Sequence, residues 1–224
     1  MNEKTAKSMP LIERHLLSVK AAEVLRDKII WGEFPPGQKL IEEELSGLMG
    51  VSRACIREAV MQLENEGLVV RTQGRSREVA TFGKADYAEI YTLRLYIEKL
   101  AVEACLKNGT LPVKTLRAKA EEIDRLVAGK PANGMKLAEA DLCFHEAILV
   151  AAGNKRALQV WQGLKNQIKT LLYLYLTTTP KAPQPDDYAN HVRLIETFQS
   201  GDRAKIDEML KVHILSGLET LSEI

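Results

Sequence analysis

The chain has 224 residues, a formal net charge of +1 and three cysteines. No apolar run reaches the roughly 18 residues that a membrane-spanning helix needs, which excludes an integral helical membrane protein. The cysteines are few, odd in number and widely spaced, so a reducing cytoplasm is expected rather than a disulfide framework. Residues 1–82 carry equal numbers of basic and acidic side chains, which excludes strong non-specific binding of nucleic acid through bulk charge.

The first part of the chain predicts two helices separated by a turn. Residues 1–17 are expected to form an N-terminal extension, and a first domain is expected over residues 18–82. The run Pro35-Pro36-Gly37 predicts a tight turn after the first helix. Apolar residues at helical spacing mark that first helix (Ala22, Leu25, Ile29 and Ile30) and a second, short helix from about residue 42 (Leu45, Leu48 and Met49). The acids Glu42, Glu43 and Glu44 are most simply the solvated N-terminus of this second helix, where negative charge suits the helix dipole.

The stretch that follows predicts the second helix of a helix-turn-helix. Gly50 can adopt the left-handed backbone of a sharp turn, and Ser52 can cap the next helix by accepting a hydrogen bond from a free N–H. An apolar face is then expected at spacings of four and three, from Ile56, Val60 and Leu63.

A second face of the same helix is basic. Arg53 and Arg57 are four residues apart, so both side chains point away from the apolar face. An arginine fork can bond both acceptors of a guanine in the DNA major groove. The sequence therefore predicts a DNA recognition helix.

A short hairpin is predicted beside this helix. Residues 68–70 and 78–82 are apolar enough to pair as strands, and the loop between them is centred on Gly74 and carries Arg71, Arg75 and Arg77. Arginines in such a wing can contact phosphates or enter the minor groove.

The second half of the chain, residues 83–224, predicts an antiparallel all-α bundle without strands. Together with the first domain, this gives a mainly α fold. Apolar residues at helical spacing or intervening turns indicate six helices: one whose core stripe runs through Ile90, Leu93, Ile97, Leu100 and Ala104, with Arg94 outside it, one through Leu116 and Leu126, and four over about 136–152, 155–177, 187–200 and 203–222.

Three of the four histidines fall in this bundle. Asp141 and His145 are four residues apart on one helix, so they share a face, whereas His191 and His213 lie on two further helices. Three imidazoles and one carboxylate are a suitable set of ligands for a divalent metal, with zinc expected first and nickel or manganese as alternatives. From spacing alone, satisfied core or surface histidines remain the simpler interpretation.

The first domain resembles the winged helix of the GntR family of bacterial transcription regulators. The resemblance implies DNA contacts from Ser52, Arg53 and Arg57, and from Gly74 and Arg75 in the wing. Glu43 departs from it, since it stands where a relative has a DNA-contacting arginine. The matching residues are Gly32, Pro36-Gly37, Leu40, Gly50-Val51-Ser52-Arg53, Arg57-Glu58-Ala59 and Glu66-Gly67-Leu68.

The bundle resembles the FCD ligand-binding domain of the FadR subfamily. Many FCD domains hold a metal with an Asp-His-His-His set, so the resemblance implies the four ligands above. It also implies that Arg94 is a bidentate clamp for a carboxylate bound at the metal, although a surface salt bridge with Glu98 is the alternative. The other matching residues are Leu93, Gly153-Asn154, Asn190, Val192-Arg193 and Gly201-Asp202.

The expected function is therefore a homodimeric transcription regulator, most simply a repressor, and not an enzyme. It would bind a double-stranded operator under the control of a small organic acid held at the metal. Two alternatives stay open: a metal sensor in which the ion is the effector, and a helical metalloenzyme in which the winged helix only docks.

Overall fold

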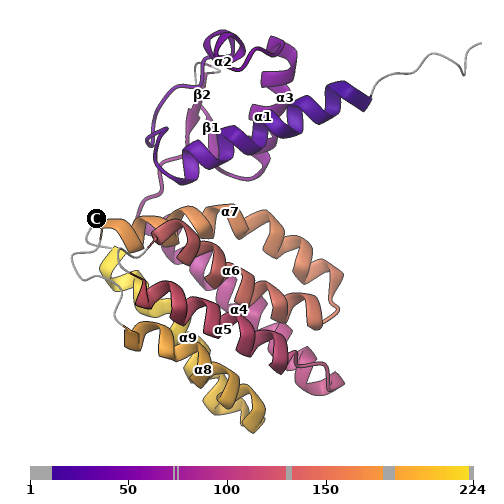
Figure 1. The fold of residues 1–224 in the computed structure, drawn as a ribbon, viewed down its shortest axis with the longest axis vertical. Coiled ribbons are helices and arrows are strands. Elements are labelled where there is room, and N and C mark those ends of the chain that lie inside the picture. The colour runs from indigo at the N-terminus through magenta and orange to yellow at the C-terminus, as the bar shows by residue number, and fades with distance from the viewer. Residues whose placement is uncertain (1–11, 73, 75, 130–132, 179–184, 222–224) are drawn as a thin grey trace, which may run out of the picture. The chain divides into compact units, whose positions relative to one another are not determined.

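The structure is a computed structural model that describes residues 12–72, 74, 76–129, 133–178 and 185–221. It is mainly helical, as predicted, and divides between Thr81 and Phe82 into two compact units (Figure 1). Within the described part of the chain, every helix is too short or too polar to span a bilayer. The three cysteines are free thiols.

The N-terminal unit is a three-helix cluster with a two-stranded wing. Helix α1 (Ile12–Ile30) and helix α2 (Glu42–Met49) both pack against helix α3 (Arg53–Asn65). Strands β1 (Val69–Arg71) and β2 (Arg77–Val79) follow and pair in antiparallel register, with Val69 opposite Val79. Helix α1 begins before residue 18, the predicted start of this domain.

Local chemistry fixes the turn between α2 and α3. Gly50 ends α2 with φ of 65°, a left-handed backbone that residues with a Cβ rarely adopt. Ser52 then caps α3, because its hydroxyl accepts a hydrogen bond of 3.2 Å from the backbone N–H of Cys55. The predicted apolar face of α3 is confirmed: Ile56, Val60 and Leu63 are fully buried.

The C-terminal unit is a bundle of six helices, and no strand occurs among its described residues (Figure 1). Helix α4 packs against α6, α7 and α9, while α5 packs between α6 and α8. Its core includes the fully buried Phe144, Trp161 and Phe198. The helices are α4 (Lys84–Asn108), α5 (Val113–Ala128), α6 (Gly134–Ala151), α7 (Lys155–Thr178), α8 (Pro185–Ser200) and α9 (Arg203–Leu221).

The expected orientation of α4 is wrong. Leu93 was expected in the core and Arg94 outside it, yet Leu93 is 43% exposed and Arg94 only 3%. The buried stripe runs through Ile90, Arg94, Ile97 and Glu98. Two charged residues can occupy that stripe because they pair with each other and with side chains of α6.

Candidate metal centre and DNA-binding face

The two arginines of the predicted recognition face lie on the surface of α3. The side chains of Arg53 and Arg57 are 60% and 57% exposed. They share this side of the helix with Ala54 and Glu58, opposite the buried apolar face. Two exposed guanidinium groups on one helix face can reach base edges in a major groove.

Acidic residues at the start of α2 hold these arginines. Arg57 Nε donates a hydrogen bond of 3.1 Å to Glu42, and Arg53 Nη1 lies 3.8 Å from Glu43. Glu42 is the first residue of α2, where a negative charge also suits the helix dipole. Glu42, which sequence reasoning assigned to a solvated helix end, is thus part of an ion-pair network, whereas Glu43 and Glu44 are exposed as expected.

The wing arginines differ in their surroundings. Arg77 is only 14% exposed at its side chain and pairs with both Glu42 (2.9 Å) and Glu64 (3.1 Å). Arg71 also pairs with Glu64 but is half exposed. Gly74 is exposed at the tip of the hairpin, whereas the predicted contact residue Arg75 lies outside the described residues.

These arginines lower the pKa of Glu64. The hydrogen bond from Arg77 is the largest cause, and with Arg71 it more than offsets the increase in pKa that partial burial produces. Arg77 therefore joins the base of the wing to both helices of the helix-turn-helix.

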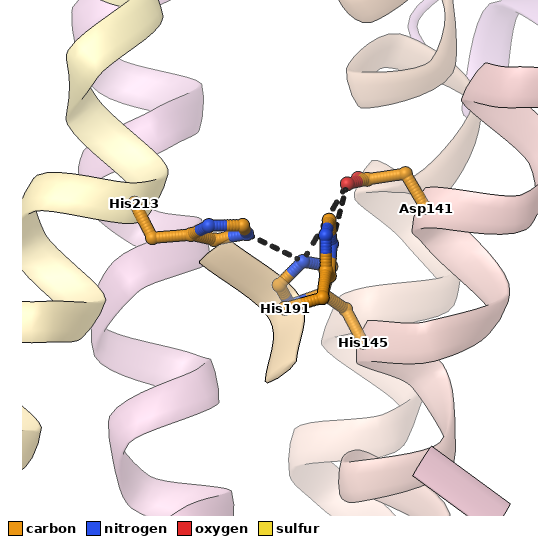
Figure 2. A group of neighbouring side chains, drawn as sticks. All are labelled: Asp141, His145, His191 and His213. Carbon is orange, nitrogen blue, oxygen red and sulfur yellow. Dashed lines mark hydrogen bonds and ion pairs between the residues drawn. The ribbon is translucent and has the colours of Figure 1, made fainter. Parts of the chain in front are cut away.

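In the bundle, the four predicted metal ligands come together from three helices (Figure 2). Asp141 and His145 extend from α6, His191 from α8 and His213 from α9. One ligand atom from each residue lies within 4.8 Å of the others. His145 Nε2 is 3.2 Å from His213 Nε2, and His191 Nε2 is 3.1 Å from Asp141 Oδ1.

Glu98 of α4 fixes the orientation of His145. His145 Nδ1 lies 2.5 Å from Glu98 Oε2, and neither side chain is exposed. Because a carboxylate can only accept, Nδ1 carries a proton, so in the neutral ring it is Nε2 that offers a lone pair to the centre of the cluster. Phe144 also packs edge-on against the rings of His145 and His191.

Arg94 lies behind the cluster, in the interior of the bundle. Its Nε donates to Glu98 Oε1 at 2.7 Å, and its Nη2 donates to Asp141 Oδ2 at 3.3 Å. The salt bridge with Glu98 is therefore present but buried, and the prediction of a surface pair is wrong. Arg94 also contacts the rings of Tyr91 and Trp161, with Cζ 5.7 Å and 6.0 Å from their centroids.

These contacts set the charge state of the site. Burial alone would raise the pKa of Asp141, but the charge of His145, the hydrogen bond from His191 and Arg94 hold it well below its usual range. Burial, with the neighbouring charges of His191 and His145, holds the pKa of His213 well below its usual range. An ionised aspartate and a neutral imidazole are the forms that bind metal.

The donor set fits a divalent metal. With bonds of about 2.0–2.1 Å, neighbouring ligand atoms of a tetrahedral or octahedral ion lie roughly 2.9–3.4 Å apart. The separations between His145 Nε2 and His213 Nε2 and between His191 Nε2 and Asp141 Oδ1 fall in that range, and His145 Nε2 to Asp141 Oδ1 is 3.8 Å. A histidine whose second nitrogen is held by a carboxylate is the usual support of such a ligand. These four residues could therefore hold zinc, nickel or manganese.

Sequence reasoning missed two features of this region. Glu98 was considered only as a partner of Arg94. Its hydrogen bond to His145 was missed because the face of α4 that points into the bundle differs from the predicted one. Trp161 was not singled out, yet its indole Nε1 is buried with no acceptor among the residues that the structure describes. No spacing rule connects Trp161 to the histidines, because the packing of α7 on α4 brings it beside Arg94.

Comparison with known families matches both units. Residues 17–79 match the bacterial regulatory proteins of the gntR family, and residues 89–216 match the FCD domain. A crystal structure of a GntR regulator from Rhodococcus sp. RHA1 is similar in fold, with a TM-score of 0.74 and 21% identity over 91% of this chain and 96% of that one.

Curated relatives are transcription regulators and not enzymes. The gluconate operon repressor of Bacillus subtilis is 27% identical, covering 86% of this chain and 79% of the relative. The probable D-xylose utilization operon repressor of Paenarthrobacter nicotinovorans is 23% identical, covering 94% and 92%. The chain belongs to the GntR family of bacterial regulatory proteins, as a DNA-binding transcriptional regulator with an FCD domain.

Proposed function

We propose that this chain is a repressor whose affinity for its operator is set by a small carboxylate, bound at a divalent metal in the bundle. The observation that carries the proposal is the convergence of Asp141, His145, His191 and His213 beside a buried arginine. The metal, zinc in the first instance, would already have four protein ligands, so a carboxylate oxygen would bind as an additional, fifth ligand. A regulator of this kind would act in the cytoplasm, where the DNA lies.

The charges of the site favour an anionic ligand. Among the described residues, Glu98 and Asp141 are paired with one permanently charged cation, Arg94, so one negative charge is left over when the imidazoles are neutral. A divalent ion reverses this to one positive charge. A monocarboxylate then completes the balance, since a buried charge without compensation is costly.

Arg94 orients the site from behind in this proposal. Its Nε and Nη2 already donate to Glu98 and Asp141. Arg94 would therefore fix the position of the aspartate ligand, and its positive charge would attract the bound anion without a two-nitrogen clamp on it. The indole N–H of Trp161 needs an acceptor, which a ligand oxygen or a bound water would supply. A hydroxy acid or sugar acid offers several such oxygens.

The effector class is tested by thermal unfolding of the metal-loaded protein with gluconate, other small hydroxy acids and their uncharged alcohols. A ligand at about a hundredfold excess over its Kd stabilises the bundle by roughly 2.7 kcal/mol. We expect the acids to raise the melting temperature and the alcohols to leave it unchanged. Equal shifts with both would reject recognition of the carboxylate.

We also propose that Ser52, Arg53, Arg57, Gly74 and Arg75 contact DNA, with Arg77 positioning the wing. Arg57→Ala is expected to weaken binding to a duplex selected by the wild-type protein by about 1–3 kcal/mol, because a base-reading fork is lost. Fluorescence anisotropy measures this change. Unaltered affinity would remove Arg57 from the interface.

The homodimer is proposed to form through the outer face of α4. Leu93, Tyr96 and Leu100 are exposed there, and a hollow of about 430 Å³ lies beside the first two. Glu89 and Lys107 are exposed on the same face at its two ends. An antiparallel two-fold pairing would place Glu89 opposite the partner subunit's Lys107 and Tyr96 opposite the partner subunit's Leu100.

Leu100→Glu is therefore expected to produce monomers in sedimentation equilibrium and to weaken DNA binding, since a charge would be buried at the seam. Val150→Glu serves as the control, because Val150 is an equally apolar exposed residue on α6. A dimer that survives Leu100→Glu, or one that Val150→Glu also dissociates, would contradict this interface.

A further inference from the structure

One carboxylate lies at the junction of the recognition helix, the helix before it and the wing. Glu42 Oε2 accepts from Arg57 Nε at 3.1 Å, and Glu42 Oε1 accepts from Arg77 Nη1 at 2.9 Å. The side chain of Glu42 is 18% exposed and that of Arg57 is 57% exposed, so the carboxylate is partly shielded from water although its bond to Arg57 lies at the surface. Glu42 therefore interacts with Arg57 more strongly than a fully exposed acid would.

The two arginines are held to different degrees. Arg77 has a second carboxylate partner, Glu64, and is nearly buried. Arg57 has only Glu42 among the described residues, and most of its side chain is exposed. The bond is made by Nε, which leaves both terminal Nη groups of Arg57 without an acceptor in the described structure. Those are the two groups that can form a fork with guanine O6 and N7.

The position of Glu42 favours a contact of Arg57 with a base and disfavours a contact of Arg57 with a backbone phosphate. A bond at Nε holds the guanidinium in one orientation, which reduces the entropy lost when the Nη groups engage a base. Its negative charge beside Arg57 opposes a phosphate, which would have to replace the carboxylate as the partner of that arginine. The first effect supports base reading, and the second weakens contacts that any DNA sequence provides.

We infer that Glu42 is a specificity-determining residue: it presents the Arg57 fork to a guanine and competes with backbone phosphates for the same guanidinium. This rests on the proposed base-reading role of Arg57. The neutral charge of residues 1–82 is consistent with it, because the basic face is balanced by acids that lie against it.

The test compares Glu42→Gln with Glu44→Gln in the full chain, loaded with metal. The amide introduced by Glu42→Gln retains an oxygen that can accept from Arg57 Nε but loses the charge. Glu44 is an exposed acid on the same helical turn with no ion pair among the described residues, so its variant removes the same charge without touching the bridge. Anisotropy is measured with a mixed-sequence duplex and with a duplex selected from a random library by the wild-type protein.

Glu42→Gln is expected to bind the mixed-sequence duplex on the order of fivefold more tightly at low salt. The slope of log affinity against log salt should steepen by about 0.9, as one further phosphate contact forms. The ratio of affinities for the two duplexes should fall. Glu44→Gln should change neither the slope nor the ratio.

Each other result has a defined meaning. Equal behaviour of the two variants, or weaker binding of both duplexes by Glu42→Gln, overturns the inference while leaving the role of Arg57 in place. An Arg57→Ala variant that binds both duplexes like the wild type overturns the base-reading role and the inference together. If Arg57 acts as inferred, Glu42→Gln added to Arg57→Ala should no longer steepen the salt slope.

Discussion

Arg94→Ala is expected to lower the free energy of unfolding of the bundle by about 3–5 kcal/mol. Arg94 is buried against Glu98 and Asp141, and it is the cation that both carboxylates share. Without it, His145 is the one partner left to Glu98 among the described residues, and Asp141 keeps the histidines. Two carboxylates would then remain in the interior with too little positive charge, which is far more costly than losing a surface pair.

The measurement is guanidinium unfolding followed by Trp161 fluorescence in a Trp31→Phe background, so that the signal comes from the bundle alone. Lys99→Ala is the matched control, because Lys99 lies on the same helix and pairs with Asp207 at the surface. The control should cost little. An Arg94→Ala variant no less stable than Lys99→Ala would mean that the buried network is not ionic.

His145→Ala is expected to remove the metal. His145 is fully buried, supplies Nε2 to the cluster and is oriented by Glu98. Removing a central ligand leaves two imidazoles and a carboxylate around a cavity, so the ion should be held far more weakly. The wild-type protein should gain roughly 2.7 kcal/mol of stability from metal at a hundredfold excess over its Kd, and the variant should gain none.

Elemental analysis after dialysis and unfolding with and without added zinc measure both effects. Glu98→Gln provides a graded comparison, since it keeps every ligand but alters the group that orients His145. Its metal affinity should fall by about 10–100-fold. Full metal occupancy in His145→Ala would reject the four-ligand site.

Much of the fold follows from local patterns in the sequence. Gly50 and Ser52 define a turn and a cap by their own backbone and hydroxyl chemistry, and the structure shows both. The last four helices of the bundle, for which the sequence predicted bounds, begin and end close to the predicted residues, because turn-forming residues such as Gly153 and Gly201 interrupt the apolar periodicity. The four-residue cluster was also predicted, with help from the resemblance to the FCD domain.

The side of α4 that faces the core was not predictable from the spacing of apolar residues. Leu93 and Leu100 suggest a core stripe, but the buried stripe contains Arg94 and Glu98 instead. Whether a charged residue can be buried depends on partners from other helices, here Asp141 and His145. Those partners are distant in sequence, so only the assembled bundle shows that the charges are satisfied.

The ion pairs of the DNA-binding face are a second feature that spacing did not indicate. Glu42 and Arg77 are far apart in the chain, and the wing brings them together. Sequence reasoning treated the acids as a solvated helix end and Arg77 as a DNA contact. In the structure Arg77 lies between two carboxylates, so we propose a positioning role for it.

The central claim is that a carboxylate acts on DNA binding through the metal. The direct measurement is the affinity of the full chain for its selected duplex, titrated with small hydroxy acids in the zinc-loaded state and after chelation. We predict that an acid changes the affinity by at least about fivefold, the lower end of typical coupling between sites, and only when metal is bound. A response to zinc without any acid, or a response to the acid that survives chelation, would contradict the account.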